Sequence, residues 1–434
     1  MQIKIEKLVF GGWGLGKYKS KVVFVPYVLP EEVVEVALTK EKKNYAFARL
    51  IEIISPSPER QSPPCPYFTV CGGCDYQHIP YSLQTEVKQK LFQEEFTRLT
   101  GLEITELLKP MFPSPSHLFY RNRVQLKVER EGYKIKIGFY KRDSRELVAV
   151  DKCLLAEKLI NQTISALQEV LQRHIAIGEE IKGIEIFVSP DEGSGIVILS
   201  TLVEVNKRHL QAIAEELMSA LPFLKDVLFK HRAFAFPRSL FEKGYTQSAL
   251  LFKIDDFKIM CYPGVFFQIN TNQNKILSKI VTQLAALHKE ESVLELYAGI
   301  GNLSLPLSAY AKRVVGLESN CLTVKNANYN AQLNKTKAFF KIVNVETALE
   351  SFLTTDDNFN CLLVDPPRQG CIRALKQSLN FIQPTKIIYV SCHPATLARD
   401  INYLLKSGYK LKSLQLIDMF PQTQHIETVA LLHR

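Results

Sequence analysis

The stretch Lys386-Ile-Ile-Tyr-Val-Ser-Cys392-His-Pro-Ala-Thr-Leu-Ala-Arg-Asp400 decides how the C-terminal part of this chain folds. Its apolar, largely β-branched run predicts a buried strand that stops at Ser391. Pro394 suits the first turn of a helix, and apolar residues then recur at helical spacing as far as Leu405. Cys392 is therefore expected between the end of a strand and the start of a helix. Open α/β sheets bind ligands at that position and a helix N-terminus favours a thiolate, so Cys392 is a candidate nucleophile.

Strands and helices alternate from about residue 263 to the end of the chain. The expected strands are 293–297, 313–318, 339–343, 361–365, 386–391, 411–418 and 428–433. This rhythm is typical of an α/β fold, in which a mostly parallel sheet carries helices on both faces.

The first strand of this region ends in the turn Glu295-Leu-Tyr-Ala-Gly-Ile-Gly-Asn302. Gly299 and Gly301 would let a nucleotide-like ligand approach the backbone, and Glu318 ends the next strand about 20 residues later. An acid at that place can accept hydrogen bonds from ribose hydroxyl groups. Ser304 stands at the position of the third glycine of the dinucleotide fingerprint, which favours S-adenosylmethionine over NAD.

Two more carboxylates are expected at strand ends. In Leu363-Val-Asp365-Pro-Pro-Arg-Gln-Gly370 the prolines stop the strand directly after Asp365. In Gln424-His425-Ile-Glu427 the acid comes just before the last strand. A capping or surface role explains either carboxylate alone equally well, but the convergence of several such groups on one sheet edge favours a functional site.

Residues 1–58 predict a small five-stranded β-barrel. Short β-branched runs alternate with turn residues, and lysines and arginines interleave with aromatic residues such as Trp13 and Tyr45. Barrels of this kind bind single-stranded nucleic acid by charge and stacking, although a solvated basic rim explains the composition equally well. Four glycines lack the spacing of a phosphate loop and are interpreted as turn residues: Gly11, Gly12, Gly14 and Gly16.

A central α+β domain is expected over residues 59–262, after a proline-rich linker at 55–64. Four cysteines could supply thiolates to one site: Cys65, Cys71, Cys74 and, much later, Cys153. A single CxxC pair with two lone partners favours an iron–sulfur cluster over zinc. Unrelated buried cysteines are the weaker explanation, because three of them crowd ten residues.

A strongly basic β-hairpin is predicted in the same region. Nine basic residues stand against four acidic ones between Arg121 and Glu146, with Glu131-Gly132 at the turn. A ribbon with this charge suits an RNA backbone, and a solvated sheet face is the alternative.

The composition agrees with a globular protein that has a polyanionic partner. The formal net charge is +10 and the sequence pI is about 9.0. The sequence holds neither an apolar run long enough to span a bilayer nor a signal-peptide pattern, so a cytoplasmic protein without membrane association is expected. In a reducing compartment, nine cysteines favour metal binding or catalysis over disulfides.

Together these motifs resemble the RNA uracil-5-methyltransferase family, and most nearly its branch that acts on 23S ribosomal RNA. The resemblance extends over nearly the whole chain. The motifs that carry it are Cys65…Cys71-Gly-Gly-Cys74…Cys153, Phe267-Gln268-Ile-Asn270, Glu295–Asn302, Asp365-Pro-Pro-Arg-Gln-Gly370, Ser391–Asp400 and His425-Ile-Glu427.

The resemblance implies three parts: an N-terminal TRAM barrel, a 4Fe-4S cluster in a central domain, and a Rossmann-like S-adenosylmethionine-dependent methyltransferase domain over 263–434. It also implies a set of residues that contact the methyl donor or line its pocket: Gln268, Tyr297, Asn302, Glu318, Asn344 and Asp365. The glycine turn itself adds Gly299 to the residues expected to bind the cofactor. His393 is a departure, since relatives often carry Asn there, and so is Ala298, where many carry Cys.

The implied chemistry explains the residue types. Carbon-5 of uracil becomes nucleophilic only after something adds to carbon-6, and the Cys392 thiolate would do so. Glu427 would then remove the carbon-5 proton, and elimination would free Cys392. The target base would be flipped out of its stack.

Other functions stay open on the sequence alone. The same chemistry on a tRNA uridine is one, and a non-catalytic RNA-binding assembly factor is another. A radical iron–sulfur enzyme fits poorly, because Cys153 supplies a fourth ligand. A monomer is expected.

Overall fold

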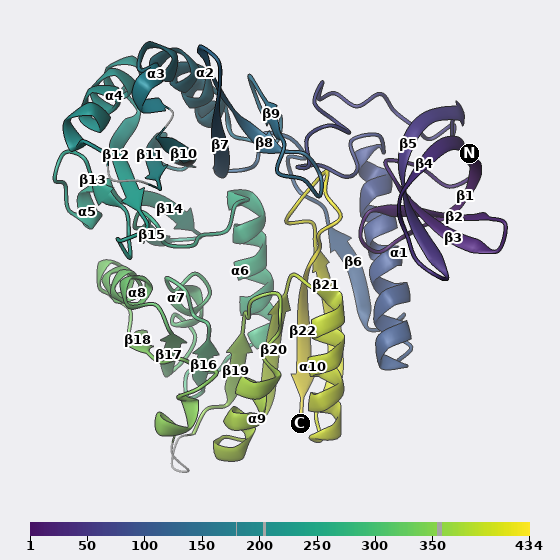
Figure 1. Cartoon of the computed structure of the whole chain (residues 1–434). Coiled ribbons are helices and arrows are strands. Elements are labelled where there is room, and N and C mark those ends of the chain that lie inside the picture. Colours follow the sequence, from purple (N-terminus) through teal and green to yellow (C-terminus); the bar gives the residue numbers. More distant parts are fainter. Residues whose placement is uncertain (179, 203–204, 354–357) are drawn as a thin grey trace.

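The computed structural model describes residues 1–178, 180–202, 205–353 and 358–434 (Figure 1). A barrel at the N-terminus lies beside helix α1, a central sheet carries its own helices, and a large sheet holds the C-terminus (Figure 1).

Alternating apolar residues close the N-terminal barrel, with strand order β1-β2-β3-β5-β4. In β1, for example, Ile3 and Ile5 point into the barrel core while their neighbours face outward. The predicted five-stranded barrel is therefore confirmed. Its strands are β1 (Gln2–Val9), β2 (Trp13–Tyr18), β3 (Lys21–Pro26), β4 (Val33–Glu41) and β5 (Tyr45–Ser55).

Two of the four glycines interpreted as turn residues lie in strand β2 instead. Gly11 and Gly12 do form a turn, with φ of 105° and 74°. A Cβ at Gly14 would lie 2.2 Å from Cγ2 of Val28, and one at Gly16 would lie 2.5 Å from the carbonyl oxygen of Lys4. The turn interpretation was wrong for Gly14 and Gly16, which allow close backbone approach inside the barrel.

The central sheet has seven strands in the order β13-β12-β11-β10-β7-β8-β9. The predicted basic hairpin is confirmed as β7 and β8, which pair with Glu131 opposite Lys134 beside the turn. Helices α2 and α4 pack on one face of this sheet. The strands are β7 (Arg123–Glu131), β8 (Lys134–Tyr140), β9 (Leu147–Ala149), β10 (Ile181–Ser189), β11 (Ser194–Thr201), β12 (Leu224–His231) and β13 (Arg238–Ser239). The helices are α2 (Lys158–Arg173), α3 (Ile175–Gly178), α4 (Lys207–Ala220) and α5 (Tyr245–Ser248).

A small ribbon of two antiparallel strands, β14 (Leu250–Ile254) and β15 (Phe257–Cys261), follows the central sheet. Its apolar side chains share a core both with the central sheet and with helix α6.

The large sheet has the order β18-β17-β16-β19-β20-β22-β21-β6. Its strands run parallel except β22, which is antiparallel to both of its neighbours. All seven strands predicted beyond residue 263 are confirmed: β16 (Ser292–Leu296), β17 (Arg313–Glu318), β18 (Phe339–Ile342), β19 (Cys361–Val364), β20 (Lys386–Ser391), β21 (Lys410–Ile417) and β22 (Glu427–His433).

The eighth strand of the large sheet comes from earlier in the chain. Strand β6 (Leu108–Phe112) pairs parallel with β21, and α1 (Tyr81–Thr100) packs beside it with Phe92 and Phe96 buried. Both elements fall inside the range 59–262 that the sequence assigns to the central domain. The boundaries at 58 and 262 stay a prediction, but the large sheet draws on residues before 262.

Helices cover both faces of the large sheet, as the α/β rhythm predicts. Ile388 and Val390 of β20 point to one core, whereas Ile387 and Tyr389 point to the other. The first core contains α6 (Thr271–Ala285), α7 (Ser304–Leu307) and α8 (Cys321–Leu333), and the second contains α1, α9 (Ile372–Phe381) and α10 (Pro394–Lys406). A short 3₁₀ turn, η1 (Leu349–Ser351), precedes β19.

Within the described ranges, no helix is both long enough and apolar enough to span a bilayer.

Candidate active site

Strand pairing brings Cys392 and Glu427 face to face. β20 and β22 are antiparallel, and Ser391 opposite Thr428 is their last pair, so Cys392 and Glu427 come next along the two segments, close enough for Glu427 to act on the pKa of the cysteine. Cys392 is half-buried and Glu427 is buried. The two groups expected to take part in chemistry are thus delivered by the register of one strand pair.

Asp365 emerges at the same edge of the sheet. β19 lies parallel to β20 with Val364 opposite Tyr389, which puts the next residue of β19 beside the two strand ends. Its carboxylate acts electrostatically on both Cys392 and Glu427. The three side chains therefore lie within electrostatic reach of one another.

Burial and neighbouring charges set the protonation of this site. Burial, with a further contribution from Glu427, raises the pKa of Cys392 to about 11 although Arg368 acts to lower it. Burial and Asp365 raise the pKa of Glu427 well above its usual range, again against Arg368. Burial raises the pKa of Asp365 to about 6. The helix N-terminus is expected to favour a thiolate, whereas burial and Glu427 act on the pKa of Cys392 in the opposite direction.

Arg368 is a site residue that the sequence reasoning missed. Its guanidinium lies 3.4 Å from Nε2 of His425, in the loop before Glu427. The signal was present in the Asp365-Pro-Pro-Arg motif, which sets an arginine three residues after a strand-end acid.

His393 explains one departure from the family pattern. It is the N-cap of α10, and its Nδ1 accepts the backbone N–H of Thr396 at 3.4 Å. Asn is a preferred N-cap residue because its side chain accepts the same hydrogen bond, so His393 replaces that function with a ring nitrogen.

The glycine turn after β16 leaves backbone open to a ligand. Tyr297, Gly299 and Gly301 have φ of 61°, 54° and 89°. A Cβ at Gly299 would meet no atom within 4 Å, whereas one at Gly301 would lie 2.9 Å from the ring of Phe340. Gly301 therefore permits packing, and Gly299 presents an accessible backbone.

Glu318 is held at the end of β17 by its own turn. Its Oε1 accepts the backbone N–H groups of Ser319 at 2.7 Å and Asn320 at 2.9 Å. This arrangement fixes the carboxylate at the edge of the sheet, where a ribose hydroxyl can reach it.

Ser304 has a structural reason to replace a glycine. Its hydroxyl donates a hydrogen bond to the buried carboxylate of Glu295. Burial raises the pKa of Glu295 to about 8, so this group needs the partner that a glycine could not provide.

Three of the remaining predicted pocket residues have hydrogen-bond links to this turn, and the fourth, Gln268, lies before α6. Asn302 exchanges two hydrogen bonds with Asn274 of α6, at 2.7 and 2.8 Å, and Asn274 was not predicted from the sequence. The Tyr297 hydroxyl donates to Glu346, whose backbone N–H in turn donates to the Asn344 side chain at 3.1 Å. Gln268 is buried at the approach to α6.

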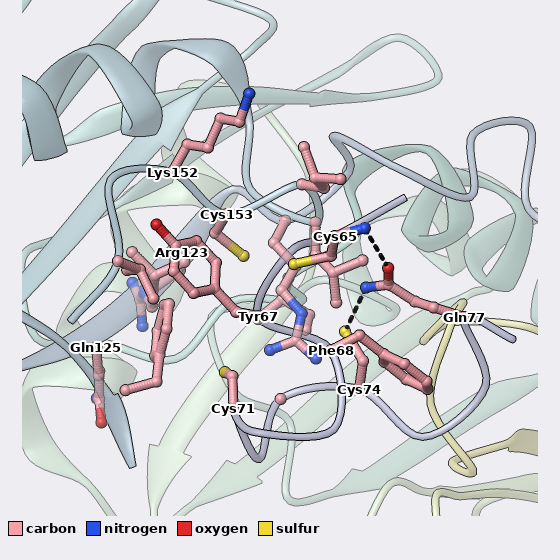
Figure 2. A pocket seen from close by; sticks show the side chains of 18 of the residues that line it. Cys65, Tyr67, Phe68, Cys71, Cys74, Gln77, Arg123, Gln125, Lys152 and Cys153 are labelled. Atoms are coloured by element: carbon pink, nitrogen blue, oxygen red, sulfur yellow. Dashed lines mark hydrogen bonds between the residues drawn. The ribbon is translucent and has the colours of Figure 1, made fainter. Parts of the chain in front are cut away.

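The four predicted metal ligands line one cavity of about 430 Å³. Figure 2 shows the sulfur atoms of Cys65, Cys71, Cys74 and Cys153 turned toward the same space. Gln77 donates to the Cys74 sulfur at 3.1 Å and accepts the backbone N–H of Cys65 at 3.2 Å (Figure 2). In the described part of the chain, no three His, Cys, Asp or Glu side chains are arranged to hold a single metal ion.

Several residues that the sequence offers to RNA are occupied inside the protein. Arg123 donates to the carbonyl oxygen of Val265 at 2.9 Å and stacks on Phe187. Arg142 stacks on Trp13 of the barrel and pairs with Asp75. Arg123, Arg142 and Trp13 are therefore committed to internal contacts.

A basic groove of about 590 Å³ lies along strands β7, β10, β11 and β12 of the central sheet. The exposed cations Lys182, Lys230 and Arg232 line it, together with the aromatic rings of Phe234 and Phe266. The Phe266 side chain is 68% exposed and borders the cysteine cavity as well.

An α/β sheet with an antiparallel strand β22, an open glycine turn and Glu318 at its carboxyl edge defines an S-adenosylmethionine-dependent methyltransferase. The chain belongs to the RNA (uracil-5-)methyltransferase family: residues 80–434 match the family described as tRNA (Uracil-5-)-methyltransferase. Residues 1–51 match the TRAM domain. It is an enzyme that methylates carbon-5 of uridine in RNA.

Relatives cover the whole chain. An "Uncharacterized RNA methyltransferase" of Aquifex aeolicus is 32% identical over 100% of this chain and 98% of the relative. The "23S rRNA (uracil(1939)-C(5))-methyltransferase RlmD" of Histophilus somni is 32% identical over 99% and 95%. The fold matches that of the Pyrococcus abyssi tRNA (uracil-54, C5)-methyltransferase solved with S-adenosyl-L-homocysteine, with a TM-score of 0.77, 24% identity and 99% coverage of both chains.

Proposed function

We propose that this enzyme, as a cytoplasmic monomer, methylates carbon-5 of a specific uridine in 23S rRNA through a transient bond between Cys392 and uracil. The observation that carries the proposal is the meeting of Cys392, Glu427 and Asp365 at adjacent strand ends, within electrostatic reach of one another. The choice of RNA is supported by relatives of nearly full-length coverage that are named as 23S rRNA methyltransferases.

In this mechanism the Cys392 thiolate adds to carbon-6 of the flipped uracil, and carbon-5 becomes the nucleophile. S-adenosylmethionine, when bound, supplies an electrophilic methyl group. Arg368 stabilises the thiolate before addition, because its charge opposes burial and the nearby carboxylates. Glu427 takes the carbon-5 proton, and its raised pKa makes its carboxylate a stronger base for that step. Cys392 then leaves from carbon-6.

The methyl donor would be held at the carboxyl edge of β16, β17 and β19. The open backbone at Gly299 and the fixed carboxylate of Glu318 suit an adenosine group. We assign Gln268, Tyr297, Asn302, Asn344 and Asp365 to the same pocket.

We assign a 4Fe-4S cluster to Cys65, Cys71, Cys74 and Cys153, with no step in the chemistry. All four side chains border one cavity. Gln77 donates a hydrogen bond to the sulfur of Cys74, and hydrogen bonds to ligand sulfurs are common around such clusters. A zinc ion would need the sulfurs about 2.3 Å from a single point, and the described residues offer no such group. Protein purified without air should contain iron and sulfide, and removing them should weaken RNA binding more than it lowers the melting temperature.

The basic groove supports an RNA path to the site. Lysine and arginine side chains neutralise phosphates, and exposed aromatic rings stack on unpaired bases. Phe266 stands at the border of the groove, two residues before Gln268.

The function is tested by methyl transfer to transcripts of 23S rRNA and of tRNA, with 5-methyluridine mapped in each. Methylation of the 23S transcript alone supports the proposal, methylation of the tRNA alone changes the substrate, and none with either favours a binding factor. A Cys392→Ala variant should bind RNA and transfer no methyl group. A Glu427→Gln variant should accumulate a covalent protein–RNA adduct, whereas free product at the normal rate would remove Glu427 from its role.

A further inference from the structure

One carboxylate joins three separate segments of the chain near the active site. Asp75 follows Cys74 directly, and its Oδ1 accepts a hydrogen bond from Nη1 of Arg142 at 2.7 Å. Its Oδ2 accepts the backbone N–H of Gln424 at 3.0 Å. The side chains of Asp75 and Arg142 are 13% and 21% exposed, so this ion pair is largely shielded from water.

The loop that leads to Glu427 is held from two sides. The backbone N–H groups of Asp75 and Tyr76 both donate to the carbonyl oxygen of Gln422, at 2.8 and 3.1 Å. Gln84 of α1 clamps the same residue, donating to its side chain at 2.9 Å and accepting its backbone N–H at 3.1 Å. Gln422 has φ of 67°, an uncommon conformation for a residue other than glycine. These contacts fix the direction from which the chain enters β22 and delivers Glu427.

The other side of the ion pair holds the barrel. The Arg142 guanidinium lies 4.7 Å from the centre of the Trp13 ring, and Nη2 donates to the carbonyl oxygen of Gly11 at 3.4 Å. A Cβ at Gly12 would lie 3.3 Å from Cβ of Asp75, so the turn between β1 and β2 approaches the cysteine loop closely.

The same turn reaches the residue that follows Cys392. Phe10, its first residue, stands edge-on to the ring of His393 with centroids 6.3 Å apart, and His393 follows Cys392 in the sequence. The Asp75–Arg142 pair therefore contacts the loop that carries one reacting side chain and the barrel turn that packs beside the other.

We propose that the Asp75–Arg142 pair is a positioning device for methyl transfer, which orients Glu427 and seats Phe10 of the barrel beside Cys392. The inference rests on the proposed function, since it takes Glu427 as the base. It means that the barrel and the cysteine loop act on the chemical step as well as on RNA binding.

The experiment compares Arg142→Met and Asp75→Asn with the unaltered enzyme by kcat, KM for RNA, and the fraction of denaturant-resistant protein–RNA adduct. Because misplacing Glu427 slows proton removal more than addition, adduct should accumulate. We expect Arg142→Met to lower kcat roughly ten- to a hundredfold while KM changes less than about threefold. Asp75→Asn should be milder, since an amide oxygen still accepts the N–H of Gln424.

Arg60→Met is the matched control. Arg60 is 16% exposed, pairs with Glu32 and donates to the carbonyl oxygen of Tyr27, so its loss should lower barrel stability without trapping adduct. Glu427→Gln is the reference for trapping: if it traps no adduct, the assignment of the base fails. If it does and Arg142→Met behaves like Arg60→Met, the positioning role is overturned. If Asp75→Asn does not fold, the comparison of Arg142→Met with Arg60→Met decides whether the pair has a positioning role.

Discussion

At Cys392, one guanidinium acts against three effects that all favour the neutral thiol. Burial, Glu427 and Asp365 raise the pKa of the cysteine, and Arg368 lowers it. Because the proposed addition of Cys392 to uracil needs the thiolate, the methylation rate should rise with pH until the thiol is ionised.

An Arg368→Met variant should move this rise to higher pH. Removing the positive charge takes stabilisation away from the thiolate and also from the Glu427 carboxylate, whose pKa Arg368 lowers as well. Both changes move the rising limb of the pH–rate profile to higher pH. The measurement is kcat/KM against pH, with Arg373→Met as control because that arginine is exposed on α9. If the rising limb of the pH–rate profile lies at the same pH in Arg368→Met, the guanidinium does not set the ionisation of Cys392.

At the scale of single residues, the sequence predicts the site residues that lie at strand ends. It does not predict residues that reach the site from segments distant in the chain. Cys392, Glu427 and Asp365 could be found because a β-branched run ends at each of them or begins directly after it. Asn274, Gln84 and Asp75 could not, since their partners lie far away in the chain. Their positions depend on how the large sheet and the cysteine loop pack together.

At the scale of elements, a buried ion pair ties α1 to the end of β21. Lys88 Nζ lies 2.6 Å from Oδ1 of Asp418, and the two side chains are 1% and 0% exposed. Tyr81 of the same helix donates to the other carboxylate oxygen at 2.9 Å.

A Lys88→Met variant should lose about 3–5 kcal/mol of stability, because a buried carboxylate loses its counter-charge. Urea unfolding measures the loss. Lys90→Met, two residues further along α1, is the exposed control and should change little. A loss under about 1 kcal/mol in Lys88→Met would mean that Asp418 finds another partner.

A second prediction concerns the glycines of strand β2. Gly16→Ala should destabilise the barrel by about 1–3 kcal/mol or more, since the new methyl group would meet the Lys4 carbonyl oxygen at 2.5 Å. Gly183→Ala in β10 is the control, because its Cβ would have ordinary contacts at 3.6 Å and beyond. Thermal unfolding of both variants, followed by near-ultraviolet circular dichroism, tests it. Equal melting temperatures would show that the barrel can widen at this point.

Strands with a β-branched core were predictable, and the edge strand was not. Leu108–Phe112 contains Pro110 and Lys109, which an internal strand would exclude but an edge strand tolerates. Gly14 and Gly16 were misinterpreted for a related reason. Glycine is favoured both in turns and where two backbone segments approach closely, and the sequence alone does not distinguish the two cases.

At the scale of the whole molecule, exposed positive charge gathers in the groove on the central sheet. The net charge of +10 includes Lys182, Lys230 and Arg232, which line this groove. Replacing all three with Gln should weaken RNA binding and lower the salt slope by about 2 to 3, if each contacts one phosphate. The control replaces Lys289, Lys312 and Lys337, which are exposed at the opposite edge of the large sheet. Equal slopes in both triple variants would exclude the groove from the RNA path.

Strand β6 has a consequence for how this protein can be divided. A fragment cut at residue 263 would lack β6 and α1, so it would expose an unpaired edge along β21 and the apolar patch that Phe92 and Phe96 cover. Such a fragment is expected to aggregate on expression, whereas one that starts near residue 80 keeps every strand of the large sheet. The catalytic half is therefore a unit in space without being a contiguous one in the chain, and any excision or domain transplant has to begin before the central sheet.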